Sequence, residues 1–388
     1  MFDSNDWASS NIWSVASDGS DPRPVLRVES PLQGDRWVTA SDAVYTRDGR
    51  SIFYISDMGL SIKTVGIDSK GLATAEPSKI FDASAARLRH LALSSDGKRL
   101  IYSAISTTSN LFMTEIAPDG TPSETKPLTK SADSRAVSPT FSPDGNTIAY
   151  QEYTTGTSAN IRLMSTDGSN DRQITTVMGF NPSWFPAGDR VGFSVPRGEQ
   201  SEYWFAAADG SVEKKLLQFD DTDIFNGRLS ADGRSVLFNS KRSGTINIWQ
   251  IPIEGGVAKQ LTFDAELAGF AAVSRDGKWI GLQIKRGGDT HVAYMPAEGG
   301  EVIQLTNEPG QSWVSDWAPD NDRIIFAGYR GSTWNVYSVS RKTREVKQLT
   351  KLDKINSYVR YPAWSPLGDK IAYEYAESTG NIWMIELN

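Results

Sequence analysis

The chain has 388 residues and a formal net charge of −7, with 40 basic against 47 acidic side chains and no cysteine. The acidic balance and the lack of basic runs argue against nucleic-acid binding, which needs clustered Lys and Arg. No apolar stretch approaches the roughly 20 residues that cross a bilayer, so we expect no membrane insertion. Without cysteine there can be no disulfide, thiolate nucleophile or Cys metal site.

One repeat organises the chain. A tetrapeptide of the Ser-x-Asp-Gly kind, followed by a short apolar strand, begins at Thr46, Ser94, Ser142, Phe185, Ser230, Ser274, Ala318 and Ser365. In Ser142-Pro143-Asp144-Gly145 the proline presets φ for a type I turn, and the glycine accepts the left-handed conformation that follows. The tetrapeptide therefore predicts a hairpin between the first two strands of each repeat.

Two further strands complete the repeat. A third strand resembles Asn247-Ile248-Trp249, and a fourth resembles Gln260-Leu261-Thr262. Four strands in a period of about 45 residues are typical of a β-propeller blade. We therefore expect an all-β fold, an eight-bladed β-propeller of four-stranded antiparallel blades.

The two ends of the chain predict how the ring closes. We expect a single domain over residues 1–388, in which residues 1–30 supply closing strands and Pro24 to Val28 forms the outer strand of the blade made by residues 361–388. Asn11 to Val15 is then a surplus strand, which adds as a fifth strand, competes with Asn381 to Ile385, or indicates a longer chain. We favour the last because Met1-Phe2 begins inside a repeat; a nine-bladed ring is the alternative. The eight blades are expected to start near residues 37, 86, 135, 178, 223, 267, 311 and 358.

These residues also resemble a known family. Ser142-Pro143-Asp144-Gly145, Trp364 before Ser365-Pro366-Leu367-Gly368, and the Gln-Leu-Thr strand are similar to the TolB-type propeller repeat, also called the WD-like repeat. Related blades form the N-terminal propellers of prolyl oligopeptidase and dipeptidyl peptidase relatives. The Gly-His and Trp-Asp pairs of true WD repeats are absent, and so is the α/β domain of TolB. The resemblance implies a fold and a bacterial, extracytoplasmic setting such as the periplasm, rather than one function.

Candidate binding residues come from the loops that join fourth strands to first strands, because such loops gather at one mouth of the channel. We interpret the arginines as partners for a carboxylate or an acidic segment, with Trp37, Trp313 and Tyr358 as anchors. The alternative is a set of ordinary solvated residues whose charges pair within the ring. The predicted binding residues are Arg36, Trp37, Arg87, Arg89, His90, Arg135, Asp221, Asp223, Phe225, Trp313, Tyr358 and Arg360.

Signals for catalysis or metal binding are weak. There is no Gly-x-Ser-x-Gly elbow, and the chain has 2 histidines. His291 stands where sister repeats have asparagine, which indicates a structural role, whereas His90 lies near the predicted channel. The acidic run from Asp220 to Asp223 lacks the order of a calcium-binding EF-hand loop, so a solvated loop is the simpler interpretation. We expect no catalytic residue, metal or cofactor.

The function that these patterns favour is a non-catalytic interaction or sensor scaffold. We expect a monomer that binds a protein or peptide partner at the channel mouth. Two alternatives stay open. One is the substrate-gating propeller of a serine peptidase that lacks its catalytic domain here, and the other is a carbohydrate-binding or carbohydrate-processing propeller.

Overall fold

The computed structural model describes residues 2–6, 9–15, 18–26, 32–33, 36–37, 40–83, 86–118, 120–132, 134–154, 158–197, 200–219 and 225–387. Their regular secondary structure is β-strand, as predicted, apart from one short 3-10 segment, η1 (Asp57–Gly59). By their contacts the residues group into two compact units, where the sequence predicted one domain. The first unit comprises Met1–Thr107, Thr155–Ser158 and Ser378–Asn388, and the second comprises Thr108–Thr154 and Ala159–Glu377.

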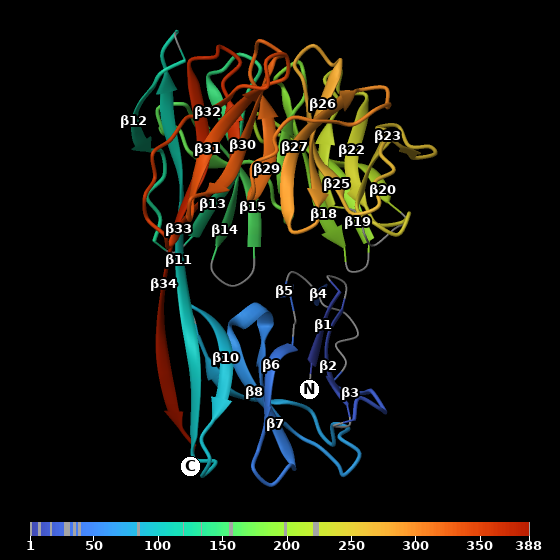
Figure 1. Cartoon of the computed structure of the whole chain (residues 1–388), viewed down its shortest axis with the longest axis vertical. Coiled ribbons are helices and arrows are strands. Elements are labelled where there is room, and N and C mark those ends of the chain that lie inside the picture. Colours follow the sequence, from blue (N-terminus) through green and yellow to red (C-terminus); the bar gives the residue numbers. More distant parts are fainter. Residues whose placement is uncertain are drawn as a thin grey trace. The chain divides into compact units, whose positions relative to one another are not determined.

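Among its described residues, the second unit contains four separate antiparallel sheets of four strands (Figure 1). A larger sheet supplies two further antiparallel groups of four strands, which one parallel bridge joins, and we call all six groups sheets. The predicted count of eight blades is not confirmed. Sheet A consists of β33 (Ser357–Trp364), β34 (Lys370–Glu386), β11 (Arg99–Ile116) and β12 (Pro122–Pro127). Sheet B consists of β13 (Ser134–Phe141), β14 (Thr147–Thr154), β15 (Ser158–Ser165) and β16 (Arg172–Gln173), and sheet C of β17 (Phe180–Trp184), β18 (Arg190–Arg197), β19 (Gln200–Ala207) and β20 (Glu213–Phe219). Sheet D consists of β21 (Phe225–Leu229), β22 (Ser235–Ser240), β23 (Asn247–Pro252) and β24 (Lys259–Gln260). Sheet E consists of β25 (Ala268–Val273), β26 (Trp279–Arg286), β27 (Asp289–Pro296) and β28 (Ile303–Gln304), and sheet F of β29 (Gln311–Trp317), β30 (Arg323–Arg330), β31 (Thr333–Ser340) and β32 (Val346–Gln348).

The six sheets pack face to face in a ring. Six buried apolar clusters each join two neighbouring sheets, and one of them brings Val336 of sheet F against Trp364 of sheet A. The first strand of every sheet also contacts the first strand of the next, so β13, β17, β21, β25, β29 and β33 form the innermost layer. Strands that are covered on both faces explain the consecutive apolar residues of the repeat.

The Ser-x-Asp-Gly turns have the predicted hairpin geometry and link the sheets. The Ser142 hydroxyl donates to Asp144 Oδ1 at 2.5 Å and accepts the Thr147 N–H at 2.9 Å, while Gly145 adopts a φ of 76°. The hydroxyl, followed by the Asn146 N–H, lowers the pKa of the Asp144 carboxyl. The second residue of a turn packs against the glycine of the turn in the following sheet, in the pairs Pro143–Gly188, Pro186–Gly233, Ala231–Gly277, Pro319–Gly368 and Pro366–Gly145. The last pair returns to the first turn.

The Asn-Ile and Gln-Leu-Thr motifs lock the third and fourth strands together, an arrangement that we call the Asn–Thr clasp. In sheet D, the Asn247 side-chain oxygen accepts the Thr262 hydroxyl at 2.9 Å and the Asp264 N–H at 2.8 Å, and Thr262 Oγ1 accepts the Ile248 N–H at 2.8 Å. The equivalent clasps hold Asn110, Thr129 and Ser131 in sheet A, and Asn335, Thr350 and Leu352 in sheet F. The motif is thus a set of hydrogen bonds that fixes strand register.

The predicted closure by an N-terminal strand is wrong. Pro24 to Leu26 lie in β3 (Arg23–Leu26), which pairs with β2 (Ser9–Ser14), while β34 pairs with β11. Hydrogen bonds at both ends of that pair run from the Leu387 N–H to the Lys98 carbonyl and from the Ile116 N–H to the Asp369 carbonyl. Both strands run on where the other repeats turn from their second strand to their third. β11 is one strand of 18 residues, and β34 is one strand of 17 residues. Sheet A therefore receives its outer strands from β11 and β12.

The first unit contains three packed layers among its described residues. Ile12 and Val25, in β2 and β3, pack on Ile52 and Tyr54 of the neighbouring sheet, and the other face of that sheet packs on Leu88. The predicted surplus strand is therefore β2, the middle strand between β1 and β3. The first unit begins with β1 (Phe2–Asp6), β2 and β3, followed by the pair β4 (Leu32–Gln33) and β5 (Arg36–Trp37). Its four-stranded sheet consists of β6 (Ala40–Tyr45), β7 (Ser51–Ser56), β8 (Ser61–Gly66) and β9 (Ser78–Asp82). β10 (Arg87–Leu93) pairs with the first part of β11.

Candidate functional site

The structure separates the predicted binding residues into two groups. Arg36 and Trp37 lie on β5, and Arg87, Arg89 and His90 lie on β10, all in the first unit. Arg135, Phe225, Trp313, Tyr358 and Arg360 lie on the innermost strands of the second unit, and Asp221 and Asp223 fall outside the described residues. The prediction placed them in loops, whereas those described occupy strands, because pattern alone locates a strand boundary poorly.

Four of the predicted residues come together at one end of the second unit. Arg135 Nη2 donates to the Tyr358 hydroxyl at 2.8 Å and to Glu374 Oε1 at 2.9 Å. The Arg360 guanidinium carbon lies 4.4 Å from the centroid of the Tyr358 ring and 5.1 Å from that of Trp313. We call Arg135, Trp313, Tyr358, Arg360 and Glu374 the rim cluster.

Glu374 is the member of the rim cluster that the sequence analysis missed. Its side chain is 0% exposed, Ser109 Oγ donates to Oε1 at 2.7 Å, and Oε2 has no hydrogen-bond partner among the described residues. The same place in the second strand is held by Gln151, Ser194, Asn239, Gln283 and Ala327 in the other sheets. A single carboxylate in a position that is otherwise neutral was the signal that could have found it.

In two other sheets this position has a structural task. Gln151 and Asn239 use their side-chain oxygens to accept the N–H groups of Asn181 and Phe270, which lie in the following sheet. Glu374 Oε1 instead holds a cation and a hydroxyl. Its neighbour Ser109 is brought close by a parallel bridge between Ser109 and Arg135, the point at which β11 meets β13. Glu374 therefore positions Arg135.

Burial and charge set the protonation of the site. Burial raises the pKa of Tyr358 and of Tyr361, and it raises the pKa of Tyr153 to about 12. For Arg135, burial alone would lower the pKa, but the negative charge of Glu374 and the neighbouring Tyr358 raise it overall. At neutral pH the site therefore presents neutral phenol groups beside guanidinium cations.

A β-bulge recurs in the innermost strands. One residue of each such bulge has a positive φ, which is 51° at Tyr361 and 58° at Phe270. Large side chains rarely adopt this conformation, so the strain is maintained by the surrounding packing. The same bulge conformation occurs at Asp42, His90, Ser138, Asn181 and Asn226. His90, a predicted binding residue, is thus a bulge residue of the first unit.

Aromatic rings extend the rim cluster. The ring centroids of Trp313 and Trp334 are 4.2 Å apart, and those of Tyr329 and Trp334 are 5.4 Å apart. With Tyr358 they make a wall of partly buried aromatic surface beside Arg360. Such residues carry large contact area with little conformational entropy to lose.

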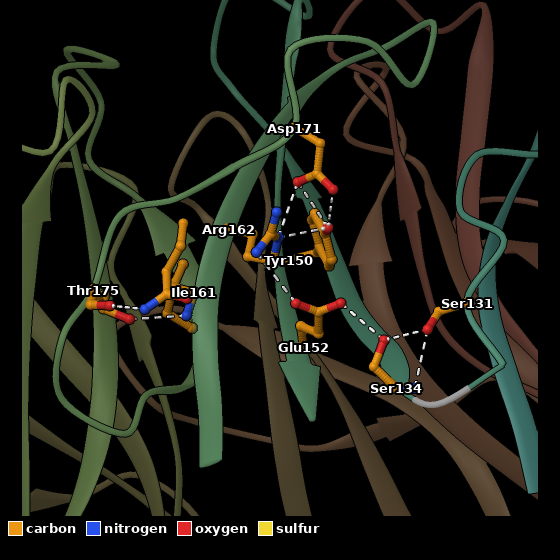
Figure 2. Close-up of polar contacts among 9 residues, drawn as sticks. Ser131, Ser134, Tyr150, Glu152, Ile161, Arg162, Asp171 and Thr175 are labelled. Carbon is orange, nitrogen blue, oxygen red and sulfur yellow. Dashed lines mark hydrogen bonds and ion pairs between the residues drawn. The ribbon is translucent and has the colours of Figure 1, made fainter. Parts of the chain in front are cut away.

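A second polar network lies within sheet B and differs from the rim cluster in being internally satisfied. Figure 2 shows Arg162 between two carboxylates: its Nε donates to Asp171 at 3.0 Å, and its Nη1 lies 3.3 Å from Glu152. The Tyr150 hydroxyl donates to Asp171 at 2.9 Å, and Ser134 donates to Glu152 at 2.8 Å. Because each carboxylate has donors, we assign this network to the stability of the sheet.

Within the described part of the chain, no group of three or more His, Asp or Glu side chains is placed to hold a metal ion. No helix there is long and apolar enough to cross a membrane.

The ring of four-stranded antiparallel sheets defines a β-propeller. Residues 118–368 match the family model described as the TolB beta propeller domain, PD40. The chain therefore belongs to this family, as the turn and strand motifs indicated.

Two curated relatives resemble parts of the chain. An uncharacterized protein of Agrobacterium fabrum, Atu1656, is 26% identical over 242 residues, which cover 60% of this chain and 67% of the relative. The uncharacterized peptidase YuxL of Bacillus subtilis is 25% identical over 159 residues, which cover 40% of this chain and 22% of the peptidase.

Solved structures agree on the fold. A putative TolB from Agrobacterium tumefaciens has a TM-score of 0.56 at 18% identity, covering 71% of this chain and 99% of that one. TolB from Acinetobacter baumannii also has a TM-score of 0.56, at 21% identity, covering 84% of this chain and 82% of that one. At these identities the similarity concerns the fold alone.

Proposed function

We propose that the second unit is a non-catalytic recognition module that binds a protein or peptide segment at the rim cluster. The observation that carries the proposal is the stacking of Arg360 on Tyr358 and Trp313, since Trp, Tyr and Arg are the residues that most often dominate binding energy. These side chains project from strands that the ring holds in place, so little ordering is required when a partner binds.

Peptide phage display on the immobilised chain tests this proposal. Enriched peptides are then measured by fluorescence anisotropy against the wild type and against a Trp313→Ala, Arg360→Ala double variant. We expect the double variant to lose at least tenfold in affinity, about 1.4 kcal/mol. If no sequence is enriched, or if enriched peptides bind the double variant as well as the wild type, the proposal is wrong.

The chain supplies a matched control for this test. Arg341 stacks over Trp279 at 4.4 Å, and this pair is of the same chemical kind as Arg360 and Trp313. Trp279 begins a second strand, whereas Trp313 lies near the beginning of a first strand, so the two pairs lie at opposite ends of the sheets. A Trp279→Ala, Arg341→Ala variant is expected to bind the selected peptides normally.

A second candidate is the substrate-gating propeller of a serine peptidase, and the similarity to the YuxL segment favours it. It predicts that the native protein carries a hydrolase domain in addition to this chain. Mass spectrometry of the intact native protein tests this, because a mass equal to that of the chain would contradict it.

A further inference from the structure

The innermost strands of the second unit carry more positive than negative charge. Their described charged residues are Arg135, Arg228, Arg360 and Asp316, although the whole chain has a net charge of −7. Arg135 is matched by Glu374, at 2.9 Å. Asp316 is matched by Arg275, which lies in a hairpin turn with its Nη2 at 3.2 Å from Oδ2. Arg228 and Arg360 remain without an ion pair among the described residues.

Arg360 has no carboxylate partner among the described residues. Its guanidinium rests on two aromatic rings, and its Nε is buried without a hydrogen-bond acceptor. An aromatic face attracts a cation, but it does not satisfy the N–H donors of a guanidinium. The guanidinium of Arg360 therefore retains a hydrogen-bond donor that no described residue satisfies.

Among the described charged residues of the innermost strands, Arg228 is the second arginine without an ion pair. It lies on β21, and burial lowers its pKa, although the negative charge of Asp316 acts in the opposite direction. Asp316 is already engaged, because its Oδ2 pairs with Arg275 and accepts the Trp364 N–H at 3.0 Å. A partly desolvated cation of this kind is costly to maintain unless a ligand neutralises it.

Tyr361, on the bulge of β33, relates the two arginines. The charges of Arg228 and Arg360, and also those of Arg135 and Glu374, act on its pKa. The channel lining thus presents two uncompensated cations, a phenol group and the aromatic wall of Trp313 and Tyr358. Carboxylates are preferred by such sites because a guanidinium donates two parallel hydrogen bonds to them.

We propose that the channel of the second unit binds a peptide carboxylate, with Arg360 as the primary contact, Arg228 as the second contact, and Trp313 and Tyr358 packing on the adjacent residue. The inference rests on the proposed function and specifies its ligand. An acidic side chain and a free C-terminus offer the same group, so the experiment separates them.

The test uses the whole chain and fluorescein-labelled pentapeptides in an anisotropy assay. Pentaglutamate is compared with pentaglutamine, each with a free and an amidated C-terminus. We expect pentaglutamate to bind at least tenfold more tightly than pentaglutamine if acidic side chains are recognised. If the C-terminus is recognised, both free-ended peptides bind and amidation removes the binding. Equal affinity for all four peptides, or no binding of any, overturns the inference.

Two matched variants assign the contact. Arg360→Met keeps the packing volume and is expected to reduce binding at least tenfold while leaving Tm unchanged or raised, because it removes a cation that lacks a partner. Arg135→Met is expected to lower Tm, because it leaves Glu374 buried without its cation. If Arg360→Met binds normally, or loses binding only because it unfolds, the assignment is wrong.

Failure of this inference differs from failure of the proposed function. If peptides selected by display bind at the rim cluster but contain no acidic residue and tolerate amidation, the recognition module stands and the carboxylate is refuted. If neither selected peptides nor pentaglutamate bind, both are refuted.

Discussion

His291 occupies the position that asparagine holds in sheets A, D and F, and replacing it by asparagine is expected to stabilise the protein. The side chain is 6% exposed, and its Nδ1 is buried without a hydrogen-bond partner in the described structure. Thr306 Oγ1 accepts the Val292 N–H at 3.0 Å, as in the other clasps. In sheet D the Thr262 hydroxyl donates to Asn247, but the Thr306 hydroxyl has no such acceptor among the described residues.

The magnitude follows from the hydrogen bonds that His291→Asn restores. An asparagine oxygen would accept the Thr306 hydroxyl and the N–H of Glu308, which corresponds to Asp264 in sheet D. A net gain of about 1 kcal/mol per hydrogen bond, reduced by the loss of imidazole packing, predicts about 1–2 kcal/mol. For a domain of this size that is a rise in Tm of roughly 2–6 °C.

Urea unfolding followed by tryptophan fluorescence measures the effect at pH 7. The matched control is Asn247→His, which makes the opposite exchange in sheet D and is expected to cost about 2–4 kcal/mol, because two buried donors lose their acceptor. An unchanged or lower unfolding free energy for His291→Asn, alongside a loss for Asn247→His, would refute the view that the missing clasp is a defect of sheet E.

Three further predictions concern the turns and the rim cluster. Gly233→Ala is expected to cost about 2 kcal/mol or more of stability, because Gly233 has a φ of 70° and an added Cβ would lie 2.8 Å from Pro186. Gly244→Ala should cost less, because Gly244 has a φ of 99° but open space around it. Equal losses of stability in thermal unfolding would contradict the packing argument. Hydrogen bonds from Ser142 and Ser230 lower the pKa of Asp144 and Asp232, so the stabilisation by these carboxylates is present above the unfolded-state pKa and is lost as the pH falls through the folded-state value. An Asp144→Asn, Asp232→Asn variant should therefore lose less stability than the wild type between pH 5 and 3 in urea titrations. Parallel losses in the two proteins would exclude these carboxyls as the cause. Glu374→Gln should cost roughly 1–3 kcal/mol of stability in the same assay, because it removes the anion that pairs with Arg135. The Arg135 side chain is 29% exposed, so solvent partly screens this pair. An unchanged stability would mean that the pair is dispensable.

The repeat was predictable because it is local. The first strands were expected near residues 135, 178, 223, 267, 311 and 358, and β13, β17, β21, β25, β29 and β33 begin at Ser134, Phe180, Phe225, Ala268, Gln311 and Ser357. Turn chemistry and apolar runs encode such hairpins directly. Closure was not predictable in this way. It depends on whether Thr107-Thr108 turns or continues, and on the pairing of segments more than 200 residues apart, which no local pattern specifies.

The candidate site was predictable in part for a similar reason. Residues at the beginning of first strands converge in any propeller, so the repeat predicted that Arg135, Trp313, Tyr358 and Arg360 lie near one another, and their contacts show that they do. Glu374 sits in a second strand, where the repeat suggested only core packing. Arg87, Arg89 and His90 occupy equivalent places on β10, a first strand that belongs to the first unit, whereas Arg36 and Trp37 lie on β5, ahead of the first strand β6 of their repeat. The uniform spacing of the repeats concealed this division into units.

Recognition of a carboxylate by the channel arginines is tested most directly by NMR of the arginine side chains. The Nε–Hε signals of Arg228 and Arg360, assigned from Arg→Lys variants of the whole chain, are followed during titration with pentaglutamate. Both signals are expected to shift in a saturable manner while the signal of Arg341 stays in place. Signals of Arg228 and Arg360 that do not move, or a uniform drift of all arginine signals, would contradict it.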